Sequence, residues 1–299
     1  MNEIRTVGVI GLGKMGLPIA TNLMQRGFRV LGYRRHGSPE LIKAGGVVAE
    51  SPADVAAQSD VLLSIVPDAA AVEDVVCGPN GTLRGLRPGT VHIEMSTIDI
   101  TRKRRVRDAV RGAGGDLLDC PISGGPSMVL PRSATTFVSG EPSSIETVRP
   151  VLDAISGSWV HTGDFGTGAQ LKYIANMLIA AHTVAAAEAI VLARRAGLDL
   201  ALVQETLDNS IASSAILRQR GPLMRQRTFF PAPGPIDTLY QILEQIQDVL
   251  AAEAISTPVF NSAKAVFDKA IADGWGQLDI AAAHDQISGQ SALTSGVAP

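Results

Sequence analysis

The first half of the chain alternates short apolar, β-branched runs with stretches of helical periodicity. The apolar runs predict strands at residues 6–11, 29–33, 61–66, 90–96, 115–122 and 135–140. Helical patterns lie between several of these runs, at residues 18–27, 51–58, 69–76 and 101–114. Strands that are apolar throughout and alternate with helices indicate a parallel sheet covered on both faces. The sequence therefore predicts an α/β domain with a doubly wound parallel sheet.

After about residue 163 the strand signals stop and only helical patterns remain. A nearly continuous helix-forming stretch runs from residue 169 to residue 197. Its apolar character is interrupted by four polar residues, Lys172, Asn176, His182 and Glu188. Because a membrane span tolerates such residues poorly, we expect an interior helix of a globular protein and no membrane. Helical patterns fill the rest of the chain up to residues 288–299, which are typical of a frayed terminus.

Composition narrows the class of protein. The chain is 45% hydrophobic and 18% charged, which allows a sizeable core, and its 299 residues suggest two domains or one large domain with an elaboration. The formal charge of −3 offers no basic excess, so nucleic acid is not expected as a partner. Two cysteines, Cys77 and Cys120, give neither a disulfide framework nor a metal cluster, so no metal is expected. The first residues lack a secretion signal, so a cytoplasmic location is expected.

A glycine-rich turn follows the first predicted strand and opens the first predicted helix. In this position the first glycine allows a tight turn, the second lets backbone approach a pyrophosphate, and the third lets helix and strand pack closely. The amide groups of the helix N-terminus then face the anion. The sequence therefore predicts a dinucleotide site at Gly11, Leu12, Gly13, Lys14, Met15 and Gly16.

The end of the second predicted strand bears on which dinucleotide binds. An NAD site usually has Asp or Glu there to bind the ribose hydroxyls. This chain has Arg34 and Arg35 instead. A guanidinium group binds a 2′-phosphate, which a carboxylate would repel, so the pattern favours NADP. In the alternative interpretation both arginines are ordinary solvated charges and the cofactor is NAD.

Lysine is scarce, and one lysine lies in an unusual place. The six lysines are Lys14, Lys43, Lys103, Lys172, Lys264 and Lys269. Lys172 lies within the long apolar helix, and Asn176 follows four residues later on the same helix face. Desolvation there lowers a lysine pKa toward neutrality, which suits proton transfer. The alternative is a lysine near a helix start that extends its amine to solvent.

Together these motifs resemble the β-hydroxyacid dehydrogenase family over essentially the whole chain. The matching segments are GLGKMGLPIATNL, IVPD (65–68), EMSTI (94–98), DCPISGG (119–125) and the glycine, lysine and asparagine pattern at 163–176. The resemblance implies a Rossmann domain at 1–165, an interdomain helix at 166–196 and an all-α substrate and oligomerisation domain at 197–299. It also implies a homodimer or homotetramer.

The resemblance further implies a function and a set of site residues. The family interconverts a 3-hydroxy acid and its carbonyl form with NADP or NAD, so a small-molecule carboxylate or carbonyl substrate is expected. Lys172 matches the catalytic lysine, and Asn176 matches the asparagine that binds substrate. The remaining matches are Ser123, Gly124 and Gly125 for the substrate carboxylate, and Val66, Pro67 and Thr97 for the cofactor.

Some positions depart from the family pattern. Met128, Val129 and Arg132 are bulkier than the usual residues after the Ser-Gly-Gly turn. Gln241 and Ile242 replace the usual Lys-Asp, although Gln241 can still hydrogen-bond substrate. A larger or less acidic substrate is therefore allowed. Two other functions stay open, an imine reductase, in which another residue generally replaces the lysine, and a non-catalytic NADP-binding scaffold.

Overall fold

The computed structural model describes residues 3–291 of the chain. Its contacts divide the chain into two compact units. The first unit is Met1–Lys172 and the second unit is Tyr173–Pro299. The predicted terminal segment 288–299 lies largely outside the described residues.

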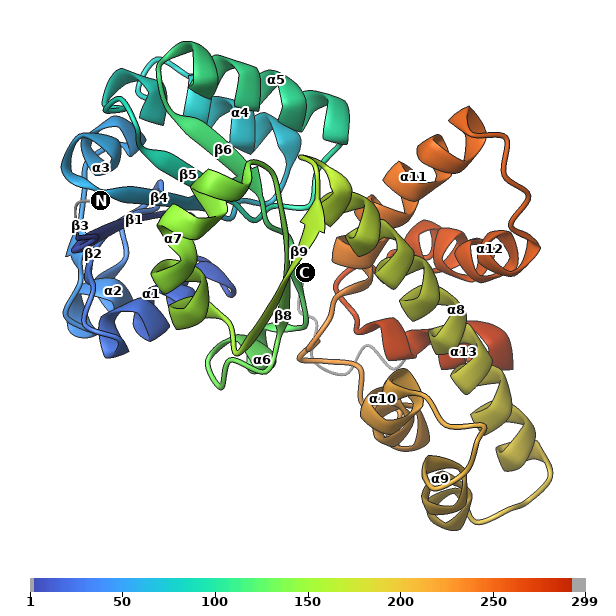
Figure 1. The fold of residues 1–299 in the computed structure, drawn as a ribbon. Coiled ribbons are helices and arrows are strands. Elements are labelled where there is room, and N and C mark those ends of the chain that lie inside the picture. Colours follow the sequence, from blue (N-terminus) through green and yellow to red (C-terminus); the bar gives the residue numbers. More distant parts are fainter. Residues whose placement is uncertain (1–2, 292–299) are drawn as a thin grey trace. The chain divides into compact units, whose positions relative to one another are not determined.

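The first unit is built on one sheet (Figure 1). Its strands are β1 (Thr6–Ile10), β2 (Arg29–Tyr33), β3 (Val47–Val48), β4 (Val61–Ser64), β5 (Val91–Glu94), β6 (Asp116–Asp119), β7 (Ile122–Ser123), β8 (Thr135–Ser139) and β9 (Ser158–Gly163). They lie in the order β3-β2-β1-β4-β5-β6-β8-β7, and β9 pairs with β8. All pairs from β3 to β6 are parallel, whereas β8 runs antiparallel to β6 and β7. This is the dinucleotide-binding strand order with an added edge.

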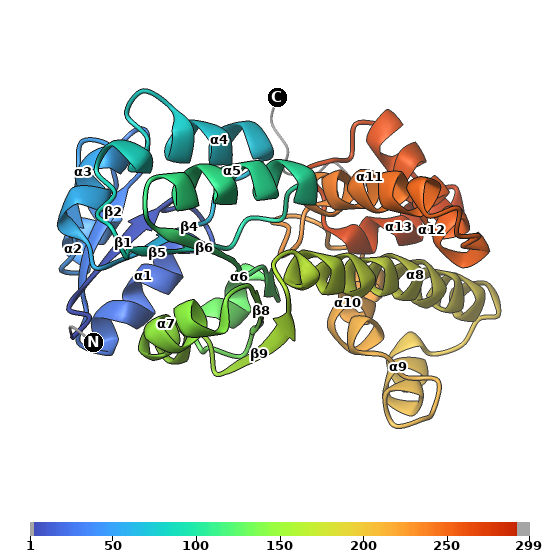
Figure 2. The ribbon, with the colours of Figure 1, turned by 45° about the horizontal axis from the view of Figure 1, so that its top comes forward.

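Helices cover both faces of this sheet because its central strands are apolar on both sides. In β4, for example, Val61 and Leu63 belong to one buried cluster and Leu62 to another. Figures 1 and 2 show α1 and α7 on one face and α3, α4 and α5 on the other. The helices of this unit are α1 (Gly16–Gln25), α2 (Pro39–Lys43), α3 (Pro52–Gln58), α4 (Ala69–Cys77), α5 (Ile100–Gly112), α6 (Pro126–Val129) and α7 (Pro142–Ile155). The predicted doubly wound sheet is thus confirmed.

Among the described residues of the second unit, the regular elements are helices, joined by loops. The long helix α8 (Thr167–Arg195) begins in the first unit and continues into the second. It is followed by α9 (Leu200–Asp208), α10 (Ala215–Gln226), α11 (Ile236–Ala252), α12 (Pro258–Ala272) and α13 (Ala283–Ser288). Leu243 on α11 and Phe260 and Phe267 on α12 are fully buried or nearly so, and α11 packs against α12. The predicted all-α second part is confirmed.

The long apolar segment of the sequence forms helix α8, and some of its polar residues are buried. Among the described residues, α8 is the one helix long and apolar enough to cross a membrane, judged by length and composition alone. Core helices of folded proteins have the same length and composition. Lys172, Asn176 and Thr183 are buried on α8. That no membrane is involved stays a prediction.

Candidate active site

The glycine-rich turn after β1 has the geometry that the sequence pattern predicts. Gly11 has a φ of +96°, and a Cβ there would come within 2.0 Å of the Ile65 carbonyl oxygen. A Cβ on Gly16 would come within 1.8 Å of the Gly11 oxygen, so α1 starts in direct contact with the turn. Gly13 has nothing within 4 Å of its Cβ position, which leaves its backbone open to a ligand. Each glycine is needed for a different reason.

A cavity of about 420 Å³ lies beside this turn. Among the residues proposed to bind cofactor, those that line it are Gly11, Leu12, Gly13, Arg34, Arg35, Val66 and Pro67. They come from the ends of β1, β2 and β4, the edge at which open α/β sheets bind ligands. Lys14, Met15, Gly16 and Thr97 do not line this cavity. The exposed backbone of Gly13 and the two guanidinium groups fit the anionic phosphates of a nicotinamide dinucleotide.

The Ser-Gly-Gly turn lies at the end of β7, elsewhere in the first unit. Ser123 closes the strand, and Gly124 has a φ of +149° that side chains rarely adopt. Gly125 then precedes α6. A Cβ on Gly124 would come within 2.7 Å of Ala134 and within 3.3 Å of the Met128 sulfur. Met128 therefore lies directly against the turn.

The other two bulky replacements point elsewhere. Val129 is fully buried in the core of the first unit. Arg132 has a φ of +59°, a conformation that favours glycine. Its guanidinium group donates to the carbonyl oxygens of Asp153 and Ser156, at the C-terminal end of α7. Of the three bulky replacements, Met128 is therefore the one that bears on the Ser-Gly-Gly turn.

Lys172 lies in the second turn of α8 and is only 8% exposed. Burial lowers the pKa of its amine from 10.5 to about 8. Among the described residues it forms no ion pair with a carboxylate that would oppose this shift. An amine with a pKa near 8 can both give and take a proton near neutral pH.

Asn176 and Gln241 belong to the second unit. Asn176 follows Lys172 by one helical turn on α8 and is 3% exposed, and its side-chain nitrogen has no hydrogen-bond partner in the described structure. Gln241 is an exposed residue of α11, and Ile242 beside it is part of the buried core. The Tyr173 hydroxyl donates to Gln245 one turn further along α11, at 2.9 Å, so α8 and α11 are linked.

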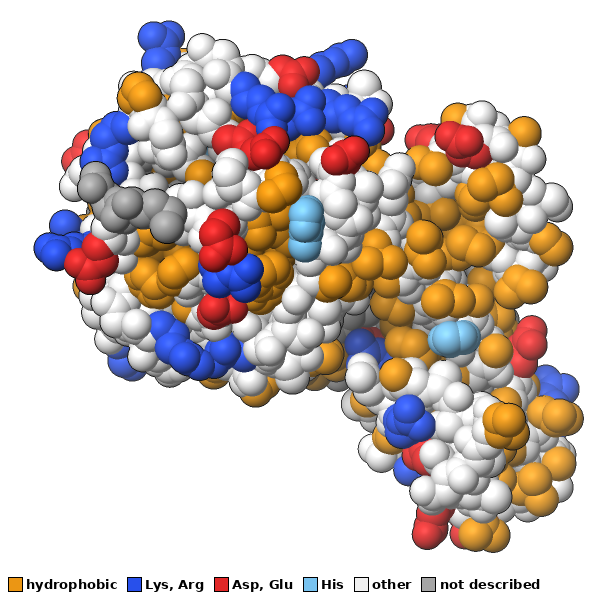
Figure 3. Space-filling view, in the orientation of Figure 1, with side chains coloured by type: hydrophobic (Ala, Val, Ile, Leu, Met, Phe, Trp, Pro, Cys, Tyr) orange, Lys and Arg blue, Asp and Glu red, His pale blue; other side chains and the backbone are white. Residues whose placement is uncertain are grey.

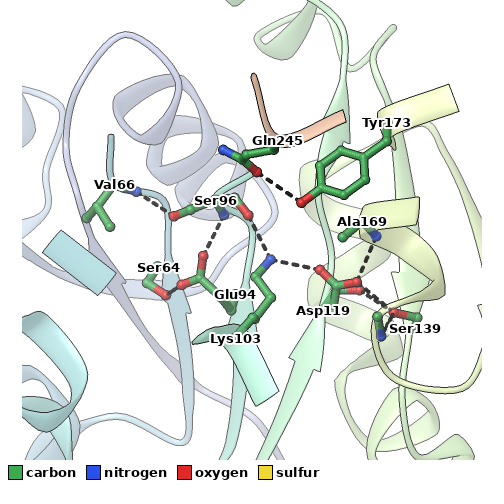
Figure 4. Close-up of polar contacts among 11 residues, drawn as sticks. Ser64, Val66, Glu94, Ser96, Lys103, Asp119, Ser139, Ala169, Tyr173 and Gln245 are labelled. Carbon is green, nitrogen blue, oxygen red and sulfur yellow. Dashed lines mark hydrogen bonds and ion pairs between the residues drawn. The ribbon is translucent and has the colours of Figure 1, made fainter. Parts of the chain in front are cut away.

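Sequence reasoning missed a buried polar cluster behind the cofactor cavity. The Ser64 hydroxyl donates to the Glu94 carboxylate and lies 2.7 Å from the His92 Nε2 atom. Glu94 also accepts the Ser96 amide at 2.6 Å, and the Ser96 hydroxyl accepts the Val66 amide at 2.9 Å (Figure 4). Burial lowers the pKa of His92 to about 3, so this ring is neutral at physiological pH. The cluster holds the loops after β4 and β5, which carry Val66 and Thr97.

Comparison with known proteins agrees with this geometry. Residues 6–163 match the NAD binding domain of 6-phosphogluconate dehydrogenase, and residues 166–286 match the NAD-binding family of NADP-dependent 3-hydroxyisobutyrate dehydrogenase. A probable mitochondrial 3-hydroxyisobutyrate dehydrogenase of Dictyostelium discoideum is 30% identical, with 94% of this chain and 90% of that protein covered. The 2-hydroxy-3-oxopropionate reductase of Escherichia coli is 32% identical, with 91% and 94% covered.

Solved structures give the same result. A crystal structure of 3-hydroxyisobutyrate dehydrogenase from Salmonella typhimurium superposes with a TM-score of 0.86 at 26% identity, covering 94% of this chain and 99% of that one. An imine reductase from Myxococcus stipitatus shares the fold at a TM-score of 0.65, but it is only 20% identical and covers 95% of this chain and 100% of that one. The chain belongs to the β-hydroxyacid dehydrogenase family, whose members are NAD(P)-dependent oxidoreductases.

Proposed function

We propose that this protein is an NADP-preferring dehydrogenase or reductase that interconverts a 3-hydroxy acid and its carbonyl form, with Lys172 as the general acid and base. The observation that carries the proposal is the buried amine of Lys172, with its pKa lowered to about 8. Most other charged side chains of the chain are solvated or paired. A desolvated, titratable amine in an oxidoreductase of this family has the properties that proton transfer requires.

The proposed chemistry divides between cofactor and protein. The bound nicotinamide supplies or accepts the hydride. In the reducing direction the Lys172 ammonium gives a proton to the developing alkoxide, and in the oxidising direction the neutral amine takes the hydroxyl proton. The Ser123–Gly125 turn binds the substrate carboxylate through its hydroxyl and amides. The unpartnered amide nitrogen of Asn176 donates to a substrate oxygen, which satisfies a buried donor.

The decisive experiment follows NADPH absorbance with a panel of semialdehydes, larger 2-methyl and aryl analogues of them, and cyclic imines. We expect turnover of a semialdehyde and its loss in Lys172→Ala, with NADPH binding retained. Turnover of imines alone would favour imine reduction. Tight NADPH binding without turnover of any compound would favour a non-catalytic scaffold.

Preference for NADP rests on Arg34 and Arg35, which line the cofactor cavity at the end of β2. Both are exposed, so they can pair with a 2′-phosphate without losing an existing partner in the described structure. We expect NADPH to bind at least ~10-fold more tightly than NADH, since charge-assisted bonds to phosphate contribute about 1.5–3 kcal/mol. Arg34→Ala/Arg35→Ala removes this preference without weakening NADH. Arg29→Ala, at the start of the same strand, is the matched control.

The substrate proposal combines the relatives with the departures of this chain. The two relatives act, by their names, on 3-hydroxyisobutyrate and 2-hydroxy-3-oxopropionate, both small hydroxy or oxo acids. Here Met128 lies against the Ser-Gly-Gly turn, and the family resemblance places the uncharged Gln241 where a lysine is usual. We therefore propose a 3-hydroxy acid or semialdehyde that is larger or less acidic than these. Met128→Ala should raise KM for the best substrate of the panel more than it changes kcat.

We also propose that the protein is a cytoplasmic homodimer or homotetramer that needs neither nucleic acid nor membrane. Figure 3 shows hydrophobic side chains gathered over the helices of the second unit. On α8 alone, Ile174 is 56% exposed, Leu178 50% and Leu192 70%. Apolar area of this kind is more stable when a second copy covers it. Light scattering after size exclusion measures the mass, and Leu178→Lys/Leu192→Lys should lower it.

A further inference from the structure

A second lysine of the first unit, Lys103 on α5, is completely buried. Its amine donates to the Asp119 carboxylate at 2.7 Å and to the Ser96 carbonyl oxygen at 2.7 Å (Figure 4). Both side chains of this ion pair have 0% exposure. This burial leaves no sign in the sequence: Lys103 lies in the highly basic stretch TRKRRVR, and such a run of charges is usually solvated.

The other oxygen of Asp119 faces the start of the helix that carries Lys172. This oxygen accepts the Ala169 amide at 2.8 Å and the Ser139 hydroxyl at 3.0 Å. The Ser139 hydroxyl in turn accepts the Gly166 amide at 3.2 Å. The first amides of a helix have no partner within the helix, so an acceptor must come from elsewhere. Asp119 thus caps α8 from strand β6, with a charge that the helix dipole favours.

Close packing leaves the first turn of α8 little freedom. A Cβ on Gly168 would come within 2.8 Å of the Phe137 carbonyl oxygen and 3.0 Å of the Asp119 carbonyl oxygen. The first turn therefore lies against the backbone of β6 and β8. Lys172 follows Ala169 by three residues, on the adjoining turn of the same helix face. Any tilt of this first turn displaces the Lys172 amine.

The hydrogen bonds of the Lys103–Asp119 pair also extend to the loop that lines the cofactor cavity. The Ser96 carbonyl oxygen accepts a bond from the Lys103 amine, and the Ser96 hydroxyl oxygen accepts one from the Val66 amide. A continuous buried chain of bonds therefore joins the loop of Val66, which lines the cofactor cavity, to the first turn of α8. Buried ion pairs add little net stability compared with apolar residues of the same shape. We therefore look for the role of this pair in the geometry that it fixes.

We propose that Lys103 and Asp119 are positioning residues that hold the first turn of α8, and with it the Lys172 amine, in register with the cofactor loop. The inference rests on the proposed function only in naming Lys172 as the group that reacts. A displacement of about 1 Å at a reacting group is enough to lower a rate by ~100-fold.

Two double variants separate positioning from folding. Lys103→Met/Asp119→Leu replaces the pair by apolar side chains of similar shape and removes the cap. Lys103→Met/Asp119→Asn also removes both charges but keeps an oxygen that accepts the Ala169 amide. We expect kcat to fall about 10- to 100-fold in the leucine variant and only about 3- to 5-fold in the asparagine variant, which keeps the cap but loses the Lys103 bond to Ser96, with KM and NADPH affinity little changed in both.

The matched control is Arg227→Met/Asp285→Leu in the second unit. Asp285 is also fully buried, and Arg227 lies 2.7 Å from it. This variant loses an ion pair whose carboxylate is fully buried and whose arginine is 22% exposed, without touching the first turn of α8, so kcat should stay near that of wild type. Equal losses of kcat in the control and in the leucine variant would overturn the proposal, as would a leucine variant with wild-type kcat.

Hydrogen exchange supplies a measurement that does not depend on activity. The Ala169 amide should exchange at least ~10-fold faster in the leucine variant than in the asparagine variant, because only the latter keeps the side-chain oxygen that accepts this amide. If wild type turns over no compound, the proposed function fails while this comparison still tests the positioning. Equal exchange in the two variants overturns it.

A milder variant covers the case in which the leucine variant does not fold. Ser139→Ala removes one bond to Asp119 and the acceptor of the Gly166 amide while leaving the ion pair intact. We expect kcat about 3- to 10-fold lower and faster exchange at Gly166. Wild-type kcat together with wild-type exchange in Ser139→Ala would overturn the proposal.

Discussion

Two regions of the first unit each bury a lysine, and the two lysines have opposite surroundings. Lys103 has 0% exposure, and its charge is matched by the Asp119 carboxylate and the Ser96 carbonyl oxygen. Lys172 is 8% exposed, and burial lowers its pKa to about 8. Burial therefore does not identify a reactive lysine by itself. In the proposed mechanism the reactive lysine also lacks a compensating carboxylate in the described structure, because without one its neutral amine is more easily formed near physiological pH.

The proposals give the two regions different roles in the site. We propose that the hydrogen bonds of Lys103 fix the geometry of the site, and that Lys172 is reactive because its amine has no carboxylate partner among the described residues. They are joined because Asp119 bonds to both Lys103 and the first turn of α8. Four measurements on variants of these two lysines distinguish the roles.

The largest effect is expected from removing the amine of Lys172. Lys172→Met should lower kcat for carbonyl reduction by about 10²- to 10⁴-fold, the usual contribution of a positioned acid or base. NADPH affinity, measured by fluorescence titration, should change less than twofold. Lys269→Met is the control, because that lysine is exposed and pairs with Asp273 at 2.6 Å. Wild-type turnover in Lys172→Met would remove Lys172 from the mechanism.

Next in size is the loss of stability when Lys103 alone is replaced. Lys103→Met leaves the Asp119 carboxylate buried without its cation, and breaking a buried pair in this way costs about 3–5 kcal/mol. The urea midpoint of the first unit should fall accordingly. Adding Asp119→Leu should restore most of the loss, since no buried charge then remains. A single variant as stable as wild type would mean that water reaches Asp119.

The contrast between the two lysines also shows what the sequence can and cannot predict. Lys172 stands out because a charged residue interrupts an apolar helix, which is a local pattern. Lys103 is surrounded by arginines in the sequence, and its partner Asp119 lies 16 residues away on β6. Only the pairing of β5 with β6 and the packing of α5 on β6 bring the two together. A tertiary contact of this kind leaves no periodic signal in the sequence.

The same reasoning separates the elements that the sequence predicts from those it misses. Strands β1, β2, β4, β5 and β8 are clear because their apolar runs are long and bounded by glycine or charge. The predicted strand 115–122 is two strands in the structure, β6 and β7, which pair with different parts of β8. β3 has only two residues, and β9 is largely polar and partly exposed, so both lack a hydrophobic pattern. The roles of Gly11, Gly13 and Gly16 can be predicted from the sequence because the backbone geometry of the turn requires glycine at these positions.

The third effect is a gain in stability when Lys172 is removed. The folded pKa, about 8, lies below the ordinary value of 10.5, so at neutral pH the fold carries the cost of a buried charge. By linkage this cost is about 3 kcal/mol and is present in full below pH 8. It declines as the pH rises from 8 to 10.5, because the folded protein has already lost the proton. Lys172→Met should therefore unfold at higher urea than wild type at pH 7, with a smaller difference at pH 10. Lower stability at pH 7 would contradict the burial argument.

The smallest effect is the pH dependence of the rate, which tests the lysine that lacks a partner directly. Reduction needs the ammonium form of Lys172, so kcat/KM should be level below pH 8 and fall about tenfold per pH unit above it. Oxidation needs the neutral amine, so kcat/KM for oxidation should rise with pH up to about pH 8 and be level above it. The inflection should persist in Lys269→Met and disappear from the residual activity of Lys172→Met. If it persisted there, another group would be titrating, and the distinction drawn between the two buried lysines would no longer explain which of them reacts.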